Sequence, residues 1–221
     1  MVIKTKSEME LFDKASEIFL EEYKNSIKEK GCFSVAFSGG DTPKELFKRL
    51  VKMKINWGNV DVFMVDERYL PPDHKDSNYK LLWENLLSKI DIPTENVRTV
   101  KYMESLETSR IEYEKEVEDF IEDNKNSFDL IILGMGKDGH TASIFSDNLN
   151  MSGTVVPSLE SELHKYNRIS LGLDVINTCR KKMFILKKDK KCILDLVLSG
   201  KEYPASFVID NVIYVINEED K

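Results

Sequence analysis

A glycine-rich segment carrying one of the three histidines in the chain has the residue types of an active-site loop. Residues 128–133 form an apolar run with the composition of a buried parallel strand, and the glycines after it mark a tight loop. The loop residues are Gly134, Gly136, Gly139 and His140. Glycine lets backbone N–H groups approach a ligand, and histidine transfers protons near neutral pH. The segment therefore gives the first indication of an active site, in which His140 could transfer a proton.

The same glycines also match Gly-x-Gly-x-x-Gly, the dinucleotide-binding fingerprint. That motif requires an acidic residue about 20 positions further on, at the end of a second strand. Only Glu160 has a suitable position, and residues 155–158 before it do not resemble a strand that leaves a helix. We therefore favour a catalytic loop, with a His140 that bonds only its own loop as the remaining alternative.

A second glycine pair follows the apolar segment 32–37 and precedes a helix-start pattern. Thr42 supplies a cap hydroxyl, a proline follows it, and Glu45 stands at the third helical position. Gly39 and Gly40 thus lie beside unpaired N–H groups at the positive end of a helix, which is a favourable position for a phosphate. An ordinary strand-to-helix turn is the alternative for this segment.

Charged residues follow a third apolar segment, 60–65, as the triplet Asp66–Arg68. Open α/β sheets bind ligands at the carboxyl ends of their strands, so this triplet predicts site residues, with a surface salt-bridge cluster as the alternative. Arg168 opens a later strand pattern, and the run Lys187–Lys191 is rich in lysine. These groups supply local positive charge, although a solvated helix start also explains most of the lysines.

Strand and helix patterns alternate along the rest of the chain. A capping box at 7–10 predicts a helix over 8–28. Further helices are expected over 79–89, 109–125, 144–145, 174–179 and 189–200, and further strands over 97–100, 168–171, 183–186, 206–209 and 212–216. Segment 146–165 is expected to be irregular. The alternation predicts one α/β domain, residues 1–221, with a doubly wound, mostly parallel sheet covered by helices on both faces.

Composition excludes several functional classes. The formal net charge of −7 argues against nucleic acid or an anionic membrane as partner, so an anionic substrate requires a local basic pocket. No signal peptide or membrane-spanning run is present, so we expect a cytoplasmic protein. Cys32, Cys179 and Cys192 lack the spacing of a disulfide framework or a zinc site.

Four segments together resemble the signatures of the 6-phosphogluconolactonase family in order and spacing. They are Ser38–Pro43, Asp66–Arg68 with Ser77–Asn78 downstream, Leu133–Phe145 and Arg168–Leu171. The resemblance covers nearly the whole chain and implies a Rossmann-like fold shared with glucosamine-6-phosphate deaminase. It further implies hydrolysis of 6-phospho-D-glucono-1,5-lactone to 6-phosphogluconate, in the oxidative pentose phosphate pathway, without metal or organic cofactor. Some lineages fuse this family to glucose-6-phosphate dehydrogenase, so fusion or coupling to that enzyme is the protein partner that the resemblance implies.

The resemblance also implies roles for individual residues. His140 resembles the general base, and Asp66 and Arg68 resemble polar groups of the catalytic site. The implied substrate-binding and phosphate-binding residues are Ser38, Gly39, Gly40, Thr42, Gly136, Arg168 and Lys190. In this reading His140 takes a proton from water, and glycine N–H groups or Arg68 hold the developing oxyanion.

The chain departs from the family pattern at two positions. Lys187 stands where the family's Gly-x-x-Lys pattern has glycine, so Lys190 is the best match to the phosphate lysine. Asp41 replaces a small hydroxyl residue and is unfavourable beside a phosphate unless its side chain turns away, for example toward the helix N-terminus.

Two alternative functions remain open. An amino-sugar-phosphate isomerase or deaminase resembles this family, but its histidine block leads into an Asn-Glu pair, whereas residues 141–145 here are Thr-Ala-Ser-Ile-Phe. A non-catalytic sugar-phosphate sensor is expected to carry a DNA-binding module, and the chain shows neither a basic N-terminal helix pair nor spare length.

Overall fold

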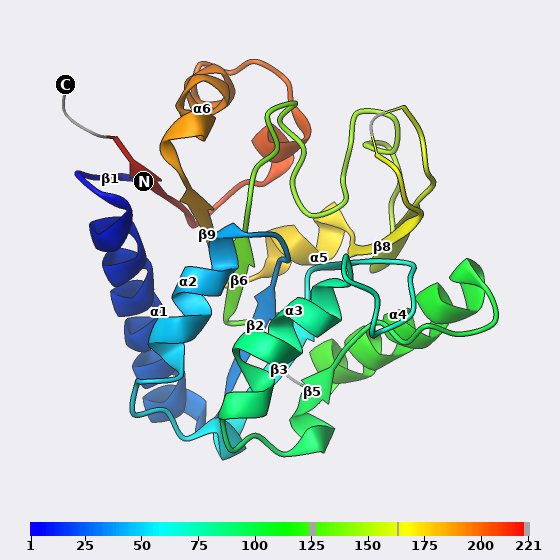
Figure 1. Ribbon diagram of the computed structural model, residues 1–221, viewed down its shortest axis with the longest axis horizontal. Helices are drawn as coiled ribbons and strands as arrows, with labels where there is room; N and C mark the ends of the chain where they lie inside the picture. The colour runs from blue at the N-terminus through cyan, green and yellow to red at the C-terminus, as the bar shows by residue number, and fades with distance from the viewer. Residues whose placement is uncertain (124–126, 163, 219–221) are drawn as a thin grey trace.

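The computed structural model describes residues 1–123, 127–162 and 164–218 and is built around a seven-stranded sheet. The strand order is β1-β10-β9-β6-β2-β3-β5, and every neighbouring pair is parallel (Figure 1). The strands are β1 Val2–Thr5, β2 Phe33–Phe37, β3 Val60–Met64, β5 Val97–Arg98, β6 Leu130–Leu133, β9 Lys181–Leu186 and β10 Val212–Asn217. This confirms the predicted α/β class and the mostly parallel sheet.

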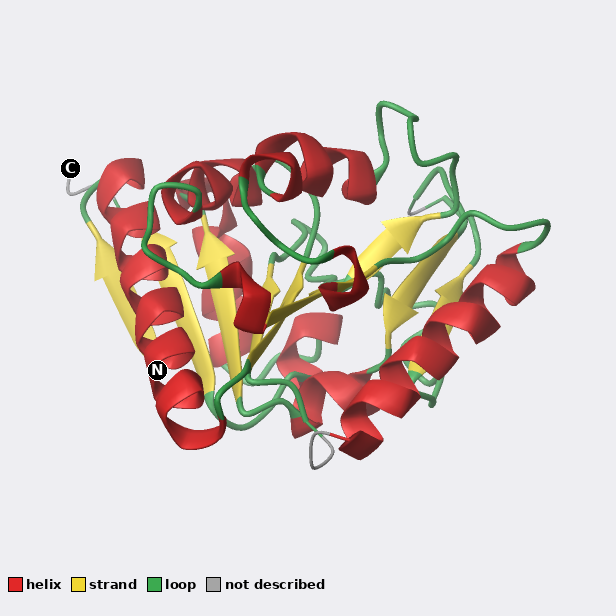
Figure 2. Ribbon diagram, turned by 90° about the horizontal axis from the view of Figure 1, so that it is seen from below, coloured by secondary structure: helices red, strands yellow, loops and turns green. Residues whose placement is uncertain are grey.

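Helices cover both faces of this sheet (Figure 2). One face packs against α1 Glu8–Lys30, α2 Thr42–Leu50 and α3 Asn78–Asn85, and the other against α4 Leu106–Asp123, α5 Leu173–Thr178 and α6 Lys191–Leu198. Alternate strand residues supply the two cores, because successive side chains point to opposite faces. In β2, Val35 and Phe37 join the first core, whereas Ala36 joins the second. The sheet is therefore apolar on both sides, as the continuous apolar runs predict.

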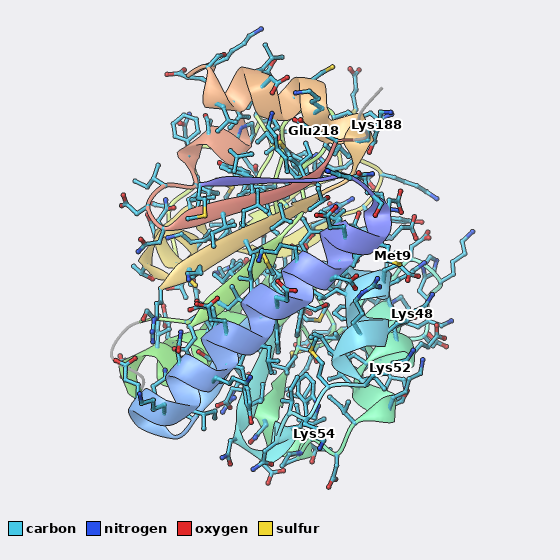
Figure 3. The ribbon with its side chains drawn as sticks, turned by 90° about the vertical axis from the view of Figure 1, so that its left-hand side faces the viewer. Met9, Lys48, Lys52, Lys54, Lys188 and Glu218 are labelled. Atoms are coloured by element: carbon cyan, nitrogen blue, oxygen red, sulfur yellow. The ribbon has the colours of Figure 1, made fainter. Side chains whose placement is uncertain are left out.

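Helix α1 shows how local sequence sets an element. The Ser7 side chain accepts a hydrogen bond from the backbone N–H of Glu10, and Gly31 ends the helix in a left-handed conformation with φ 79°. The helix therefore begins at the predicted residue and extends two residues beyond the predicted end. It runs across the sheet beside α2, with charged side chains on its outer surface (Figure 3).

A second, three-stranded sheet was not predicted. It consists of β4 Asp66–Arg68, β8 Arg168–Leu171 and β7 Val155–Ser158, paired antiparallel in that order. The expectation that 146–165 is irregular is therefore wrong at β7, whose central Pro157 obscured the pattern. Proline is tolerated there because β7 is an edge strand of this sheet, with β8 as its neighbour. The N–H of Leu171 donates to the carbonyl of Val65 at 2.8 Å, which joins the two sheets.

Two predicted elements are replaced, one by a turn and one by a 3-10 helix. Residues 144–145 form no helix, because an isolated bridge between Thr141 and Ile144 closes a tight turn. Segment 206–209 is not a strand, because Pro204 starts a 3-10 helix that includes Ser206. The 3-10 helices are η1 Trp57–Asn59, η2 Leu87–Lys89, η3 Thr94–Asn96, η4 Lys188–Lys190 and η5 Pro204–Phe207. Strand β1 was missed, and residues 124–125 of the predicted helix 109–125 lie outside the described residues.

The cap predicted at Thr42 is wrong, and so are those expected from Asp174 and Asp189 for the helices over 174–179 and 189–200. Helix α6 begins at Lys191, after Lys190, without a side-chain cap. Helix α2 already includes Thr42, and the preceding Asp41 makes no side-chain cap because its carboxylate accepts from Lys44 Nζ at 2.7 Å. Helix α5 begins after Gly172, while the Asp174 carboxylate accepts from the N–H of Gly153 at 3.2 Å. The Asp41 and Asp174 carboxylates thus both bind other partners.

Candidate active site

A cavity of about 330 Å³ opens at the carboxyl ends of β2 and β6. These strands are neighbours from which the chain crosses in opposite directions, the position where doubly wound sheets bind ligands. The residues predicted to act in catalysis or to bind substrate and phosphate all line this cavity: Ser38, Gly39, Gly40, Thr42, Asp66, Arg68, Gly136, His140, Arg168 and Lys190. Glu67 of the predicted triplet and Gly139 of the loop do not line it. The structure thus brings the predicted residues together, while their individual roles stay predictions.

His140 is paired with a carboxylate that sequence reasoning did not select. Its Nδ1 lies 2.6 Å from Oδ1 of Asp138, two residues earlier in the loop. Burial raises the pKa of Asp138, but the charge and hydrogen bonds of His140 lower it more, so the pKa lies below its usual value. An ionised Asp138 favours a proton on Nδ1 and leaves the lone pair on Nε2. The Asp-Gly-His order was the available signal for this pair.

The glycines of the loop leave space for the Asp138–His140 pair. A Cβ on Gly136 would lie 2.2 Å from both Asp138 Oδ1 and His140 Nδ1, closer than atoms can approach. Gly139 has φ 80°, a conformation that glycine adopts without strain. Gly136 therefore does more than line the cavity, because any side chain there would displace the pair.

Phe145 holds one face of the His140 ring. The centroids of these two rings are 4.5 Å apart, and the ring of His164 stacks on Phe145 at 4.2 Å. The Arg168 guanidinium carbon lies 5.6 Å from the centre of the same Phe145 ring. Phe145 is buried and therefore restricts the orientation of the imidazole.

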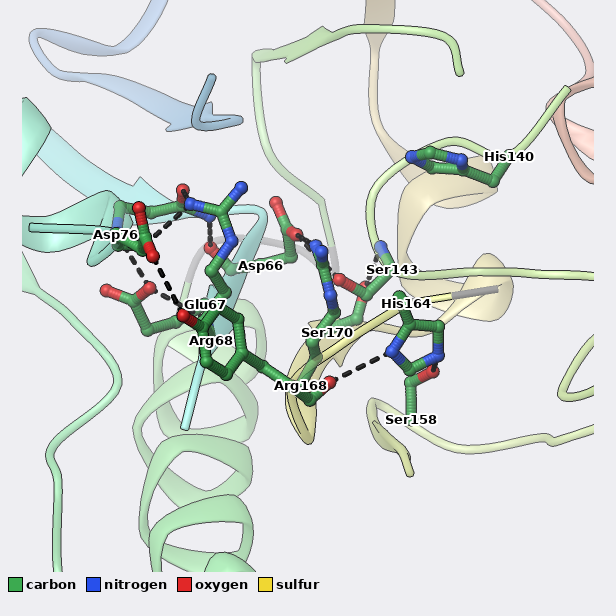
Figure 4. Close-up of polar contacts among 12 residues, drawn as sticks. Asp66, Glu67, Arg68, Asp76, His140, Ser143, Ser158, His164, Arg168 and Ser170 are labelled. Atoms are coloured by element: carbon green, nitrogen blue, oxygen red, sulfur yellow. Dashed lines mark hydrogen bonds and ion pairs between the residues drawn. The ribbon is translucent and has the colours of Figure 1, made fainter. Parts of the chain in front are cut away.

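Buried Asp66 and half-buried Arg168 form an ion pair at the base of the site (Figure 4). Arg168 Nη1 lies 3.7 Å from Asp66 Oδ2, which also accepts a hydrogen bond from Ser143 Oγ at 2.6 Å. Burial lowers the pKa of the Arg168 guanidinium, and the nearby Asp66 opposes that effect. Ser143, another residue that sequence reasoning did not select, thus orients the carboxylate that faces the guanidinium.

Arg68 is held by the first turn of α3. Its Nη1 donates to the carbonyl of Asp76 at 2.6 Å and to Asn78 Oδ1 at 3.4 Å. The Asn78 amide nitrogen donates to the carbonyl of Asp66 at 2.9 Å. A Cβ on Gly39 would lie 1.9 Å from Asn78 Oδ1, so only glycine fits between Asn78 and the first glycine turn.

Two buried polar atoms of the cavity lining have no hydrogen-bond partner within the described residues. They are Oγ of Ser38 and Nε of Arg168. Buried polar groups are usually paired, so unpaired donors beside a cavity favour a ligand that accepts hydrogen bonds.

The cavity is locally basic, although the chain as a whole is acidic. An anionic ligand requires such a local excess of positive charge. Its charged lining residues are Asp41, Asp66, Arg68, Arg168, Lys187 and Lys190. Asp41 turns to Lys44, whose hydrogen bond and charge lower the pKa of that carboxyl. Lys187, which departs from the family pattern, forms an ion pair with Glu8, with 3.0 Å between Nζ and Oε2.

Neither a dinucleotide site nor a metal cluster is evident in the part of the chain that the structure describes. Residues 134–154 contain no helix, so the glycine loop opens no helix N-terminus for a pyrophosphate. Among described residues, no group of three or more His, Cys, Asp or Glu side chains is placed to share a metal ion. No described helix has the length and apolar character needed to cross a membrane.

Comparisons with known proteins give concordant results. The family model for glucosamine-6-phosphate isomerases/6-phosphogluconolactonase matches residues 6–215. A 6-phosphogluconolactonase of Thermotoga maritima is 35% identical over 184 residues, which cover 82% of each chain. One from Nostoc sp. is 37% identical over 139 residues, covering 61% of this chain and 58% of that protein.

Solved structures agree with this assignment. The crystal structure of 6-phosphogluconolactonase from Thermotoga maritima superposes with a TM-score of 0.90 and 30% identity, covering 99% of this chain and 100% of that chain. The 6-phosphogluconolactonase of Trypanosoma brucei superposes with a TM-score of 0.84 and 25% identity, covering 99% and 96%. The chain therefore belongs to the glucosamine-6-phosphate isomerase/6-phosphogluconolactonase family.

Proposed function

We propose that this protein hydrolyses 6-phospho-D-glucono-1,5-lactone to 6-phospho-D-gluconate in the oxidative pentose phosphate pathway. The observation that carries the proposal is the Asp138–His140 pair on a basic cavity, in a chain whose relatives are named 6-phosphogluconolactonase. The substrate is the product of glucose-6-phosphate oxidation, so the dehydrogenase that makes it is the proposed functional partner.

The proton path starts at His140. With Nδ1 bonded to Asp138, Nε2 accepts a proton from a water molecule as the water oxygen bonds to the lactone carbonyl carbon. The tetrahedral intermediate then collapses, and the bond from that carbon to the ring oxygen breaks. The ring oxygen takes the proton back from Nε2, which restores the neutral imidazole. Ionised Asp138 stabilises the imidazolium between these two steps.

The cations of the cavity take the negative charges of the substrate. Arg68 is assigned to the oxyanion, because Asp76 and Asn78 hold its guanidinium at the wall. Loss of one such donor typically costs about 3 kcal/mol of transition-state stabilisation. Arg168 and Lys190, with the Gly39–Gly40 turn before α2, are assigned to the phosphate.

The contacts after the histidine favour a lactonase over a deaminase. A deaminase requires a second acid–base group for ring opening and carbon–proton transfer. Here the Thr141 hydroxyl donates to the carbonyl of Gly134 at 2.9 Å, and the Ser143 hydroxyl donates to Asp66. These side chains serve the loop and Asp66, and no carboxylate occurs in 141–145.

Turnover of enzymatically generated lactone tests the proposal. Glucose 6-phosphate and its dehydrogenase supply the lactone, and acid release is followed with and without this protein. Wild-type protein should exceed the spontaneous rate, and His140→Ala should lower kcat by about 10²- to 10⁴-fold. The surface variant Lys52→Ala, beyond the end of α2 (Figure 3), is the control and should match wild type. A wild-type rate equal to the spontaneous rate would contradict the proposed activity, whereas full activity of His140→Ala would contradict only the assigned base.

A further inference from the structure

Glu67 lies between two cavity residues in sequence but does not line the cavity. Side chains alternate along a strand, so Glu67 of β4 points away from the face that carries Asp66 and Arg68. The residue is 3% exposed and is therefore a carboxylate held inside the protein. A buried carboxylate that does not meet the ligand requires a structural partner for its charge.

That partner is the first turn of α3. Glu67 Oε1 accepts from the N–H groups of Arg68 at 2.7 Å and Asn78 at 2.8 Å. Its Oε2 accepts from the N–H of Tyr79 at 2.7 Å and the hydroxyl of Ser77 at 2.9 Å. Each carboxylate oxygen thus takes two donors, and the side chain connects β4 to the helix start.

The clamped turn contains Asn78, whose side chain meets three parts of the cavity wall. It donates to the carbonyl of Asp66, accepts from Arg68 Nη1, and occupies the space beside Gly39. A shift of this helix start would therefore move a guanidinium and a glycine turn together.

We propose that Glu67 is a positioning residue, which sets Asn78 and through it Arg68 and the Gly39 turn for the reacting substrate. The inference rests on the proposed lactonase function. Glutamine has nearly the same shape but only one acceptor oxygen, so Glu67→Gln would turn an NH2 group toward two donors. The substitution also removes a buried charge, and burying a charge is itself costly. We therefore expect it to displace the start of α3 more than it lowers the free energy of unfolding.

Asp129 provides a matched control at the opposite end of the sheet. It is also 3% exposed, and its Oδ2 accepts from the N–H and hydroxyl of Ser34 at 2.8 and 3.0 Å. It lies just before β6, at the amino end of the strands, and does not line the cavity. Asp129→Asn therefore perturbs a buried carboxylate without changing the site.

A double-mutant cycle tests the proposal. Wild type, Glu67→Gln, Asn78→Ala, the double variant and Asp129→Asn are compared by kcat/KM and by calorimetric Kd for 6-phosphogluconate. Glu67→Gln and Asn78→Ala should each lower kcat/KM about ten-fold. If the two residues act through one another, kcat/KM of the double variant should equal that of the less active single variant. Asp129→Asn should stay within two-fold of wild type.

Two results would overturn the inference: activity of Glu67→Gln within two-fold of wild type, or a double variant whose losses multiply. If Glu67→Gln does not fold, Glu67→Asp, which keeps both acceptor oxygens, replaces it in the same cycle. A wild-type protein without turnover would contradict the proposed function alone, and the Kd cycle would then decide on Glu67. Absence of both turnover and 6-phosphogluconate binding would overturn both.

Discussion

The two ends of the parallel sheet use a buried carboxylate in the same way but with different consequences. At the amino end, Asp129 ties β6 to Ser34 of β2 and pairs with Lys30 at 3.1 Å. At the carboxyl end, Glu67 ties β4 to the helix start that carries Asn78. The first contact joins β2 and β6 at the end of the sheet away from the cavity, whereas the second stands directly behind the cavity wall. Burial and hydrogen bonding alone therefore do not distinguish a structural carboxylate from one that positions site residues.

The largest loss of activity is expected from a change at Asp138, in the loop at the carboxyl end of the sheet. Asp138→Asn should lower kcat about 10²-fold or more, because an amide neither favours the Nδ1 proton as strongly nor stabilises the imidazolium. Thermal unfolding should stay near wild type, because the loop is partly exposed. Lactone turnover and calorimetry of the same preparation measure both quantities, with Asp147→Asn as the exposed loop control. Wild-type activity of Asp138→Asn would remove the carboxylate from the mechanism.

The next largest effect is expected in the pH dependence of the unfolding free energy, to which Glu67 should contribute. Burial raises the pKa of Glu67 from 4.5 to about 7, against the hydrogen bonds that lower it. A raised folded-state pKa means that stabilisation is present below pH 4.5 and is lost as the pH rises through about 7. From pH 4 to pH 8, the unfolding free energy of wild type should fall by about 3 kcal/mol relative to Glu67→Gln. Denaturant unfolding at each pH measures this, and a constant difference would contradict the raised pKa.

Asp129→Asn, at the amino end of the sheet, should change stability without changing activity. Loss of the carboxylate that meets Ser34 and Lys30 should lower the unfolding free energy by about 2 kcal/mol. The value of kcat/KM should be unchanged, because the change lies at the opposite edge of the sheet. Urea unfolding and lactone turnover measure the two responses. Equal losses of stability and activity would mean that the two ends are coupled.

The smallest effect is expected for the phosphate lysine. Lys190→Ala should raise KM about ten-fold with little change in kcat, since a lost charge-assisted contact costs about 1.5 kcal/mol. Lys52→Ala is the matched control and should behave as wild type. If Lys187→Ala raises KM and Lys190→Ala does not, the phosphate contact belongs to Lys187, which also lines the cavity.

Local patterns predicted the elements that carry strong local signals. Helix α1 has a capping box and a terminal glycine, and the apolar runs mark β2, β3 and β6. Strand β7 was missed because Pro157 interrupts it and its partner β8 comes ten residues later in the sequence. Strand β1 is short and depends on pairing with β10, more than 200 residues later. Such elements exist through long-range pairing that a local pattern does not contain.

The candidate site divides along the same line. The predicted cavity residues carry motif signals of their own, so they could be predicted together. The side chains that hold them, Asp138, Ser143 and Asn78, act through contacts that only the folded loops create. Gly136 shows the difference: its place in the motif was visible, whereas the space it leaves for two neighbouring side chains was not.

The packing of Phe145 has a stereochemical consequence for the proposed reaction. One face of His140 rests on Phe145 and its Nδ1 is held by Asp138, so the imidazole has no freedom to turn over during a catalytic cycle. The nitrogen that deprotonates water must then be the one that reprotonates the departing oxygen. Nε2 must therefore lie within reach of both oxygens bonded to the lactone carbon, the attacking water oxygen and the departing ring oxygen. A fixed imidazole thus requires the tetrahedral carbon to present both oxygens to the same nitrogen.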